Sequence, residues 1–429
     1  MNKMKRIMWV VGCVLFCGHS FAQSDPVIPK PHHPIFGCLT YEQLTGNWGG
    51  MRDRLEESGI SISAANVFEY SGVMKGGLHQ TGSSRNLFTA DLEIDTEMLF
   101  GLKGGTFFAQ FLSVTAENGG TGDSGDLQGY TNIESEHSLN TLYEIWYQQV
   151  LFNGRFRAKI GKVDANSEFA YVAPLKEVSA ACEFTHSSAG FQPTIAGFPS
   201  YPDPAMSLNL FITPYQGVGT QLTVAYGFYD GAAGVDGVST GSRGPSSFFS
   251  NDLSDDYFHI AEGQFAWDEL GDLPGGSVSV GGWFHTGEWA MFDGGVKDGT
   301  GGFYATIHQQ LTAPDLENTD RGLYLFGQYG YGDDRIVEVG QVYSVGALQI
   351  GLGGFRPDDL LGVYASFADL SDDSAAGFER DELAIETLYR FAITPAIWIQ
   401  PGVQYIFNPS GDPSVDNALV GQVRFGVAL

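Results

Sequence analysis

Acidic side chains alternate with apolar ones between residues 86 and 100, where the sequence reads NLFTADLEIDTEMLF. The acids and one threonine occupy every second position: Thr89, Asp91, Glu93, Asp95 and Glu97. A helix would spread these side chains around its circumference, whereas a strand places all of them on one face. The spacing therefore predicts a strand with one carboxylate-lined face and one apolar face.

Two environments fit such a strand. In a soluble antiparallel sheet, the apolar face covers a core and the acids meet solvent. In a membrane barrel, the apolar face meets lipid and the acids line an aqueous lumen. A basic row has the same spacing, because Arg155, Arg157 and Lys159 alternate with apolar residues. The elements that position these two rows decide between the environments.

Catalytic and metal chemistry are weakly supported. The His32–His33 pair lies in a proline-rich segment and lacks the spacing of a metal site. The later histidines are not accompanied by a serine nucleophile motif. The acidic stretch 369–374 lacks a full calcium-binding loop. We expect no catalytic residue, no metal site and no cofactor, and the sequence leaves open whether acidic loops bind calcium.

The first 22 residues have the composition of a secretory signal peptide. Lys3, Lys5 and Arg6 precede an apolar run of roughly ten residues, and the segment ends in small residues at Ala22. Cleavage there removes three cations and moves the formal charge from −28 to −31. Export would permit a disulfide between the remaining cysteines, 38 and 182, and the sequence leaves open whether they pair.

Composition narrows the class of protein further. The acidic balance argues against nucleic-acid binding, which needs basic patches on phosphate. No apolar run after the signal approaches the about 18 residues of a membrane-spanning helix. A membrane form of this chain must therefore be a closed barrel.

Alternating segments of about ten residues recur from residue 60 onward, which is the length that a tilted strand needs to cross a bilayer. We place about sixteen of them, at 60–71, 86–98, 105–116, 140–151, 154–161, 206–213, 218–229, 256–268, 276–286, 300–311, 321–331, 340–352, 359–368, 380–392, 396–407 and 417–429. Long and short connections alternate between them, the longest being 117–139, 162–205 and 230–255. Single-chain barrels show this rhythm because one end has tight turns and the other has long loops.

The clearest strands keep charged residues off one face. In IETLYRFAI, Glu386 and Arg390 fall on one side, and the aliphatic and aromatic residues fall mainly on the other. A lipid-facing Arg or Lys would cost about 2–4 kcal/mol at mid-membrane. The sequence therefore predicts an all-β, transmembrane antiparallel barrel of about 16 strands over 60–429. A lead with a short helix, residues 23–59, precedes it.

Seven stretches occur in order along the mature chain: LTGNWGGMRDRLEESGI, GDLQGYTNIES, LYEIWYQQ, KIGKVDANSEF, GGWFHTGE, GFRPDDLLGVYASF and IQPGVQYIFNPSG. Together they resemble the carbohydrate-selective porins of the OprB type. The resemblance implies a sixteen-stranded barrel in the bacterial outer membrane, passive diffusion of small sugars, and a long third extracellular loop that narrows the lumen. It also implies contact with lipid and the barrel assembly machinery, and it leaves a homotrimer open. Leu429 departs from the terminal aromatic residue usual in such barrels.

A pore that favours sugars needs paired donors and acceptors and an aromatic surface at its narrowest point. We expect the basic row 155–159 to oppose the acidic row 91–97, so that a transverse field orders hydroxyl groups and disfavours large ions. The other expected lumen residues are Glu144, Trp146, Gln148, Arg390, Trp398, Gln404, Gln422 and Arg424. The alternative is that these are ordinary hydrated wall residues away from the constriction.

The long loop 162–205 carries aromatic residues that are candidates for the constriction: Phe169, Tyr171, Phe184, Phe191 and Phe198. The alternative is that they pack the loop against the wall. The expected function is carbohydrate-selective passive diffusion, with a general or cation-preferring porin as the first alternative. A membrane-embedded hydrolase and a soluble carbohydrate-binding protein are the others.

Overall fold

The computed structural model describes residues 43–116, 120–133, 138–173, 175, 178–231, 256–271, 273–314, 320–353 and 356–429. The expected signal peptide, the His32–His33 pair and Cys38 lie outside these residues. Cys182 is disulfide-bonded. Within the described part of the chain, no helix is long and apolar enough to cross a membrane.

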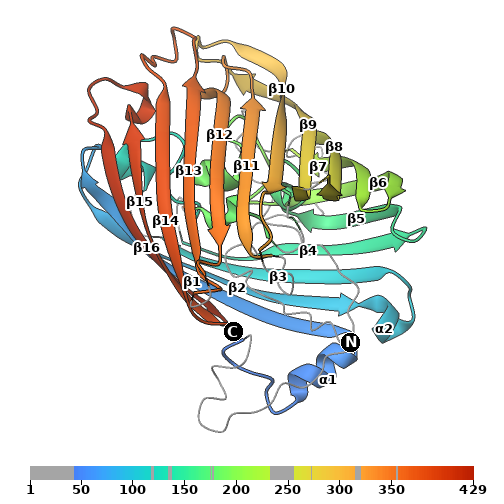
Figure 1. The fold of residues 1–429 in the computed structure, drawn as a ribbon. Coiled ribbons are helices and arrows are strands. Elements are labelled where there is room, and N and C mark those ends of the chain that lie inside the picture. The colour runs from blue at the N-terminus through green and yellow to red at the C-terminus, as the bar shows by residue number, and fades with distance from the viewer. Residues whose placement is uncertain are drawn as a thin grey trace.

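Sixteen antiparallel strands form one closed barrel (Figure 1). They are β1 (Ile60–Lys75), β2 (Gly82–Asp95), β3 (Gly105–Ala116), β4 (Leu139–Leu151), β5 (Phe156–Val163), β6 (Ala205–Gly217), β7 (Thr220–Asp230), β8 (Tyr257–Leu270), β9 (Leu273–Ala290), β10 (Val296–Gln310), β11 (Gly322–Tyr331), β12 (Val339–Ile350), β13 (Leu360–Leu370), β14 (Glu382–Thr394), β15 (Ile397–Phe407) and β16 (Ala418–Ala428). Each strand pairs with its neighbours in sequence, and β1 pairs with β16 to close the ring. The predicted fold class is confirmed.

Side chains alternate between the two faces of the wall, as the period of two requires. In β14, Ile385, Phe391 and Ile393 are exposed, whereas Glu386 and Arg390 are buried. The exposed apolar residues belong to the outer surface, and the buried polar ones face the interior. The wall is therefore apolar outside and polar inside, which is the reverse of a soluble barrel.

The strand predicted over 86–98 ends earlier than expected. β2 stops at Asp95, whose carboxylate accepts hydrogen bonds from the backbone N–H groups of Glu97 and Met98 at 2.8 and 3.1 Å. Asp95 thereby caps the short helix α2 (Thr96–Phe100). The prediction that Glu97 belongs to the inward acidic row is wrong, because this side chain is exposed on α2.

The other helices within the described residues are short. They are α1 (Met51–Glu57), α3 (Thr121–Ser124) and α4 (Ser187–Gly190), with 3-10 turns η2 (Ala165–Ser167), η3 (Ala181–Glu183) and η4 (Pro409–Gly411). α1 lies beyond the rim of the barrel, close to the chain's C-terminal end (Figure 1).

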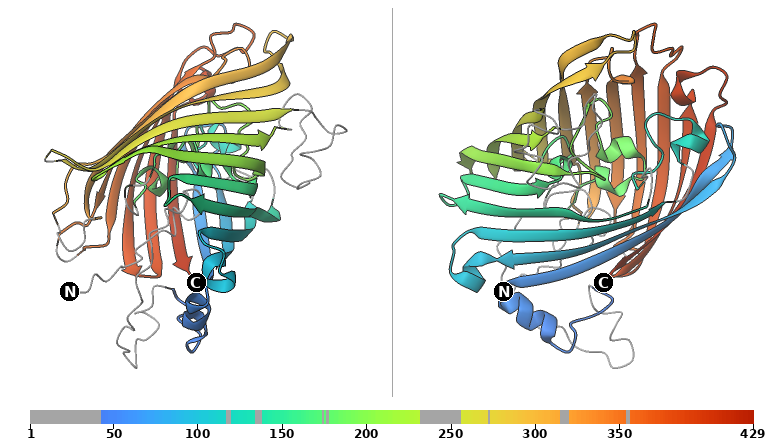
Figure 2. Two further views of the ribbon diagram at one scale, coloured as in Figure 1. Left: turned by 90° about the vertical axis from the view of Figure 1, so that its right-hand side faces the viewer. Right: turned by 180° about the vertical axis from the view of Figure 1, so that it is seen from behind.

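Two connections at the long-loop end fold into the barrel. We name 117–138, between β3 and β4, loop 2, and 164–204, between β5 and β6, loop 3. Figure 2 shows the green segments of loop 3 inside the ring of strands. Loop 3 packs Phe169 against the β3–β10 side of the wall and Phe184 against the β11–β14 side. The hydrophobic core of the protein therefore lies between these loops and the inner wall.

Candidate permeation site

A belt of polar side chains crosses five neighbouring strands of the inner wall. Register pairs Gln400 of β15 with Arg424 of β16, and Arg424 with Glu69 of β1. Glu69 is paired in turn with Arg85 of β2. Arg390 of β14 extends the belt, because its Nε donates to Gln400 Oε1 at 2.7 Å. All five side chains are buried.

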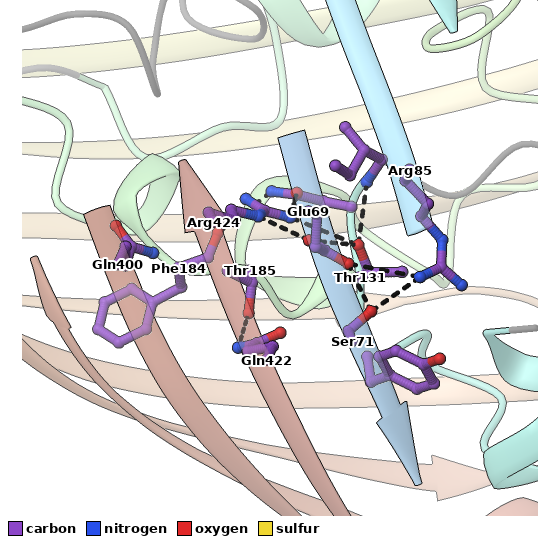
Figure 3. Close-up of polar contacts among 12 residues, drawn as sticks. Glu69, Ser71, Arg85, Thr131, Phe184, Thr185, Gln400, Gln422 and Arg424 are labelled. Carbon is purple, nitrogen blue, oxygen red and sulfur yellow. Dashed lines mark hydrogen bonds and ion pairs between the residues drawn. The ribbon is translucent and has the colours of Figure 1, made fainter. Parts of the chain in front are cut away.

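Glu69 lies between two guanidinium groups of this belt (Figure 3). Arg424 Nε donates to Glu69 Oε2 at 2.7 Å, and Arg85 Nη1 lies 3.5 Å from Oε1. Ser71 Oγ donates to Oε1 at 2.7 Å and accepts from Arg85 Nη1 at 2.8 Å. Arg85 Nε and Nη2 have no hydrogen-bond partner among the described residues. One carboxylate between two cations leaves this part of the belt with a net positive charge.

Loop 2 is attached to the belt through two neighbouring residues. Thr131 Oγ1 donates to Glu69 Oε2 at 3.1 Å, and Arg424 Nη2 donates to Asn132 Oδ1 at 2.6 Å. Loop 3 is attached at the other end of the belt, where Arg390 Nη2 lies 2.5 Å from Glu183 Oε2. The belt therefore holds both loops with charged groups.

The two loops also bind each other. The backbone N–H of Asn132 donates to Thr185 O at 2.8 Å, and the backbone N–H of Ser187 donates to Gly129 O at 2.8 Å. Ser187 Oγ donates to Thr131 O at 2.8 Å. Loops 2 and 3 therefore form one hydrogen-bonded unit inside the barrel.

A cavity of about 230 Å³ lies between these loops. Its lining is Gln128, Thr131 and Asn132 from loop 2, and Ser187, Ser188, Phe191, Pro193, Tyr201 and Pro202 from loop 3. None of these residues is charged, and the rings of Phe191 and Tyr201 lie 6.3 Å apart. Amides and hydroxyls beside aromatic rings suit an uncharged ligand with hydroxyl groups and an apolar ring face.

A second charged cluster joins loop 3 to β5. Glu168 of loop 3 is 2.8 Å from Arg157 Nη2 and forms a second ion pair with Lys159. Burial alone would raise the pKa of Glu168, but the charges of Arg157 and Lys159 outweigh it and lower the pKa to about 2. Lys159 Nζ also lies 3.8 Å from the ring centre of Trp146. The basic residues of β5 thus hold loop 3 in place.

The predicted transverse field between the acidic and basic rows is wrong. β2 and β5 are separated only by β3 and β4, so the two rows share one side of the ring. Arg157 and Lys159 instead both pair with Glu168 of loop 3. Arg155 is exposed in the turn before β5, so the prediction that it belongs to the inward basic row is wrong.

The other predicted residues lie on the inner wall. On β2, Asp91 accepts from Gln110 Nε2 at 2.8 Å, and Glu93 is half-buried. The remaining set is buried: Glu144, Trp146, Gln148, Arg390, Trp398, Gln404, Gln422 and Arg424. Several contact the loops directly, as Gln404 Nε2 does in donating to Tyr130 O at 2.7 Å. Their contribution to permeation stays a prediction.

The five aromatic residues predicted for the constriction divide into two groups. Phe169 and Phe184 are fully buried against wall aromatics, and Phe198 packs on Phe258 at 5.7 Å. These three attach the loop to the wall. Tyr171 is half-buried, and its carbonyl accepts from Thr306 Oγ1 at 3.3 Å. Phe191 alone among the five lines the cavity.

The sequence did not identify the wall carboxylates that bind the loops. These loop anchors are Glu69, Glu262, Glu382 and Glu386. Glu262, for example, accepts from the backbone N–H of Ala170 at 3.2 Å. Strand alternation could have placed Glu69 on the inner face, because its neighbours Phe68 and Tyr70 are apolar. No local pattern indicates that such a residue would bind a loop.

Comparisons with known proteins match this architecture. The family described as "Carbohydrate-selective porin, OprB family" matches residues 79–429. The chain belongs to this OprB family. Porin B of Pseudomonas aeruginosa is similar to it, with 23% identity over 431 residues that cover 89% of this chain and 90% of that protein.

Solved structures support the same fold for this OprB-family chain. The high-pH structure of Pseudomonas putida OprB has a TM-score of 0.76 at 20% identity, covering 91% of this chain and 99% of that one. The low-pH structure of the same protein has a TM-score of 0.57 at 17% identity with the same coverage. A porin barrel implies the bacterial outer membrane and a channel rather than an enzyme.

Proposed function

We propose that this chain is an outer-membrane channel for passive, carbohydrate-selective diffusion of small sugars, and that loops 2 and 3 together form its constriction. The cavity between these loops carries the proposal. Its uncharged lining offers hydroxyl, amide and aromatic groups. Its volume of about 230 Å³ is smaller than that of sites for drug-sized ligands, which is about 300–1,000 Å³. The cavity therefore suits a molecule of monosaccharide size.

The belt beside the cavity supports the proposal by holding loop 2 in place. The Arg85 side chain is only 1% exposed, so it acts through loop 2 and not by contact with a passing sugar. Arg85 lies next to Tyr130 of loop 2, with 5.7 Å between the guanidinium carbon and the ring centre.

Membrane placement follows the same proposal. The short-turn end of the barrel would face the periplasm, and loops 2 and 3 would enter the lumen from the extracellular side. Export by a signal peptide over 1–22, with mature lead 23–59 and barrel 60–429, belongs to this proposal. So does contact with lipid and the assembly machinery.

Purified protein in liposomes tests the proposal. Entry rates are compared for glucose, a disaccharide and amino acids of matched size, together with single-channel conductance in salt. We expect glucose to enter faster than amino acids of its size, with small ionic conductance. Entry that depends on size alone, with large cation-biased conductance, would identify a general porin, which the formal charge of −28 favours.

A further inference from the structure

β14 carries two buried carboxylates on its inner face, four residues apart. Glu382 and Glu386 both have no exposed side-chain surface. Four residues of an antiparallel strand span about 13 Å. Among the described residues, every hydrogen bond to these two carboxylates comes from a neutral donor. Such groups are costly to bury unless their acceptors are fully satisfied, so the donors around them are energetically important.

Glu382 binds loop 2. Its Oε2 accepts from the backbone N–H of Leu127 at 2.9 Å, and its Oε1 accepts from the backbone and side chain of Gln128, both at 3.2 Å. The backbone N–H of Ser410 donates to Oε2 at 2.8 Å. Both carboxylate oxygens of Glu382 therefore accept hydrogen bonds, and a donor group in place of either oxygen would face an N–H group.

Glu386 binds loop 3 in the same way. Its Oε1 accepts from Thr185 Oγ1 at 2.5 Å and from the backbone N–H of Thr185 at 3.0 Å. Its Oε2 accepts from the backbone N–H of His186 at 3.0 Å. Gln422 Nε2 adds a further bond to Oε1 at 3.1 Å. One carboxylate thus holds two consecutive residues of the loop.

The anchored residues adjoin the cavity. Gln128, held by Glu382, lines it directly, and Ser187 and Ser188 follow the segment held by Glu386. Because both anchors belong to one rigid strand, the separation between Glu382 and Glu386 fixes where each loop docks along the lumen. The gap between the loops is then determined by β14 as well as by the bonds between the loops.

We propose that Glu382 and Glu386 are positioning residues that set the width of the gap between loops 2 and 3, and hence the channel's discrimination between monosaccharides and larger sugars. This inference rests on the proposed sugar channel. Neither residue needs to contact the sugar. Replacing either carboxylate with the isosteric amide turns one acceptor into a donor, which must then face an N–H group or leave it unpaired.

The test compares Glu382→Gln and Glu386→Gln with Glu288→Gln, which removes the same charge from an exposed position on β9. Hydrogen exchange reports the docking of each loop. We expect faster exchange at 127–128 in E382Q and at 185–186 in E386Q, and no change at either segment in E288Q. In liposomes, the glucose-to-disaccharide entry ratio should fall several-fold toward one in the first two variants only.

Thr185→Val provides a milder variant in case a Gln substitution prevents folding. It removes the hydroxyl that donates to Glu386 and accepts from Gln404 and Gln422, and it keeps both backbone bonds to the carboxylate, so a smaller fall in the same ratio is expected. This inference would be overturned if the wild type is selective and the variants keep its glucose-to-disaccharide entry ratio although their loops exchange faster. A wild type that does not discriminate between sugars and amino acids of equal size would overturn the proposed function itself.

Discussion

At the scale of single residues, the interior is organised by buried charges that are compensated across strands and loops. Glu69 contacts Arg424, Arg85 and Ser71, and also binds loop 2 through Thr131. Removing one member of such a group leaves a charge without its partner in a place that water cannot easily reach. Removing one charged side chain therefore lowers the free energy of unfolding by more than the ion pair contributes to it.

Arg424→Met is expected to lower the free energy of unfolding by about 3 kcal/mol, the lower end for a broken buried ion pair, because Glu69 keeps Arg85. The measurement is the urea midpoint of heat-modifiable migration on a gel. Arg380→Met is the control, since Arg380 is exposed and its side chain donates, among the described residues, only one hydrogen bond, to Asn408 Oδ1 at 3.5 Å. Equal midpoints for the two variants would contradict the role given to Glu69.

At the scale of elements, strand assignment depends on local alternation, which the sequence displays directly. The predicted boundaries of β3 agree with the structure, and β2 was extended too far because Asp95 caps a helix instead of continuing the strand. Loop contacts are different. Thr185 and Glu386 are 201 residues apart, and no periodic pattern links a carboxylate to the backbone N–H groups that it will bind.

The two faces of β2 should respond oppositely to substitution. Leu92 faces outward, paired with Ile62 and Ala109, so Leu92→Arg places a charge against lipid at a cost of about 2–4 kcal/mol. We expect little folded protein in the outer-membrane fraction. Glu93→Gln on the inner face should fold normally and change only the cation bias of the conductance. Similar folding losses in both variants would show that β2 is not a membrane strand with a wet inner face.

Loop 2 should dock less tightly as pH rises. Asp126 is buried beside Leu127 and accepts from Ser124. Burial, and then the charge of Glu382, raise the pKa of Asp126 to about 7. In a released loop, the pKa of this carboxyl would have its usual value of about 4. The docked loop therefore retains a proton that the released loop gives up, and docking weakens between these two pH values and is constant above them.

Hydrogen-exchange protection of residues 120–133, corrected for the intrinsic rate at each pH, measures this effect. Wild-type protection should fall between about pH 4 and about pH 7. Asp126→Asn keeps the oxygen that accepts from Ser124 but cannot ionise, so its protection should fall less steeply over this range. Parallel slopes in the two proteins would show that another group controls docking.

At the scale of the whole molecule, closure of the barrel depends on the seam between β1 and β16. Their register runs from Ala65 opposite Ala428 to Lys75 opposite Leu419, with one irregularity near the long-loop end. At the short-turn end, the segment that contains α1 binds the end of β16. The backbone N–H of Leu44 donates to Ala428 O at 2.8 Å. A closed barrel has no free edge, so the seam is where opening would begin.

Arg52 of α1 is the side chain that fastens this segment to the seam. Its guanidinium donates to Gly46 O at 2.5 Å and to Leu429 O at 3.3 Å, and it lies 4.2 Å from the ring centre of Trp48. Because hydrogen bonds to a charged group contribute about 1.5–3 kcal/mol each, Arg52→Ala should lower the free energy of unfolding by about 2 kcal/mol.

Arg54→Ala is the matched control on the same helix. Arg54 is exposed, and its Nε donates within its own segment, to Gly50 O. Faster exchange at the ends of β1 and β16 in R52A, but not in R54A, would place the loss at the seam, and equal urea midpoints for the two variants would show that α1 does not fasten it.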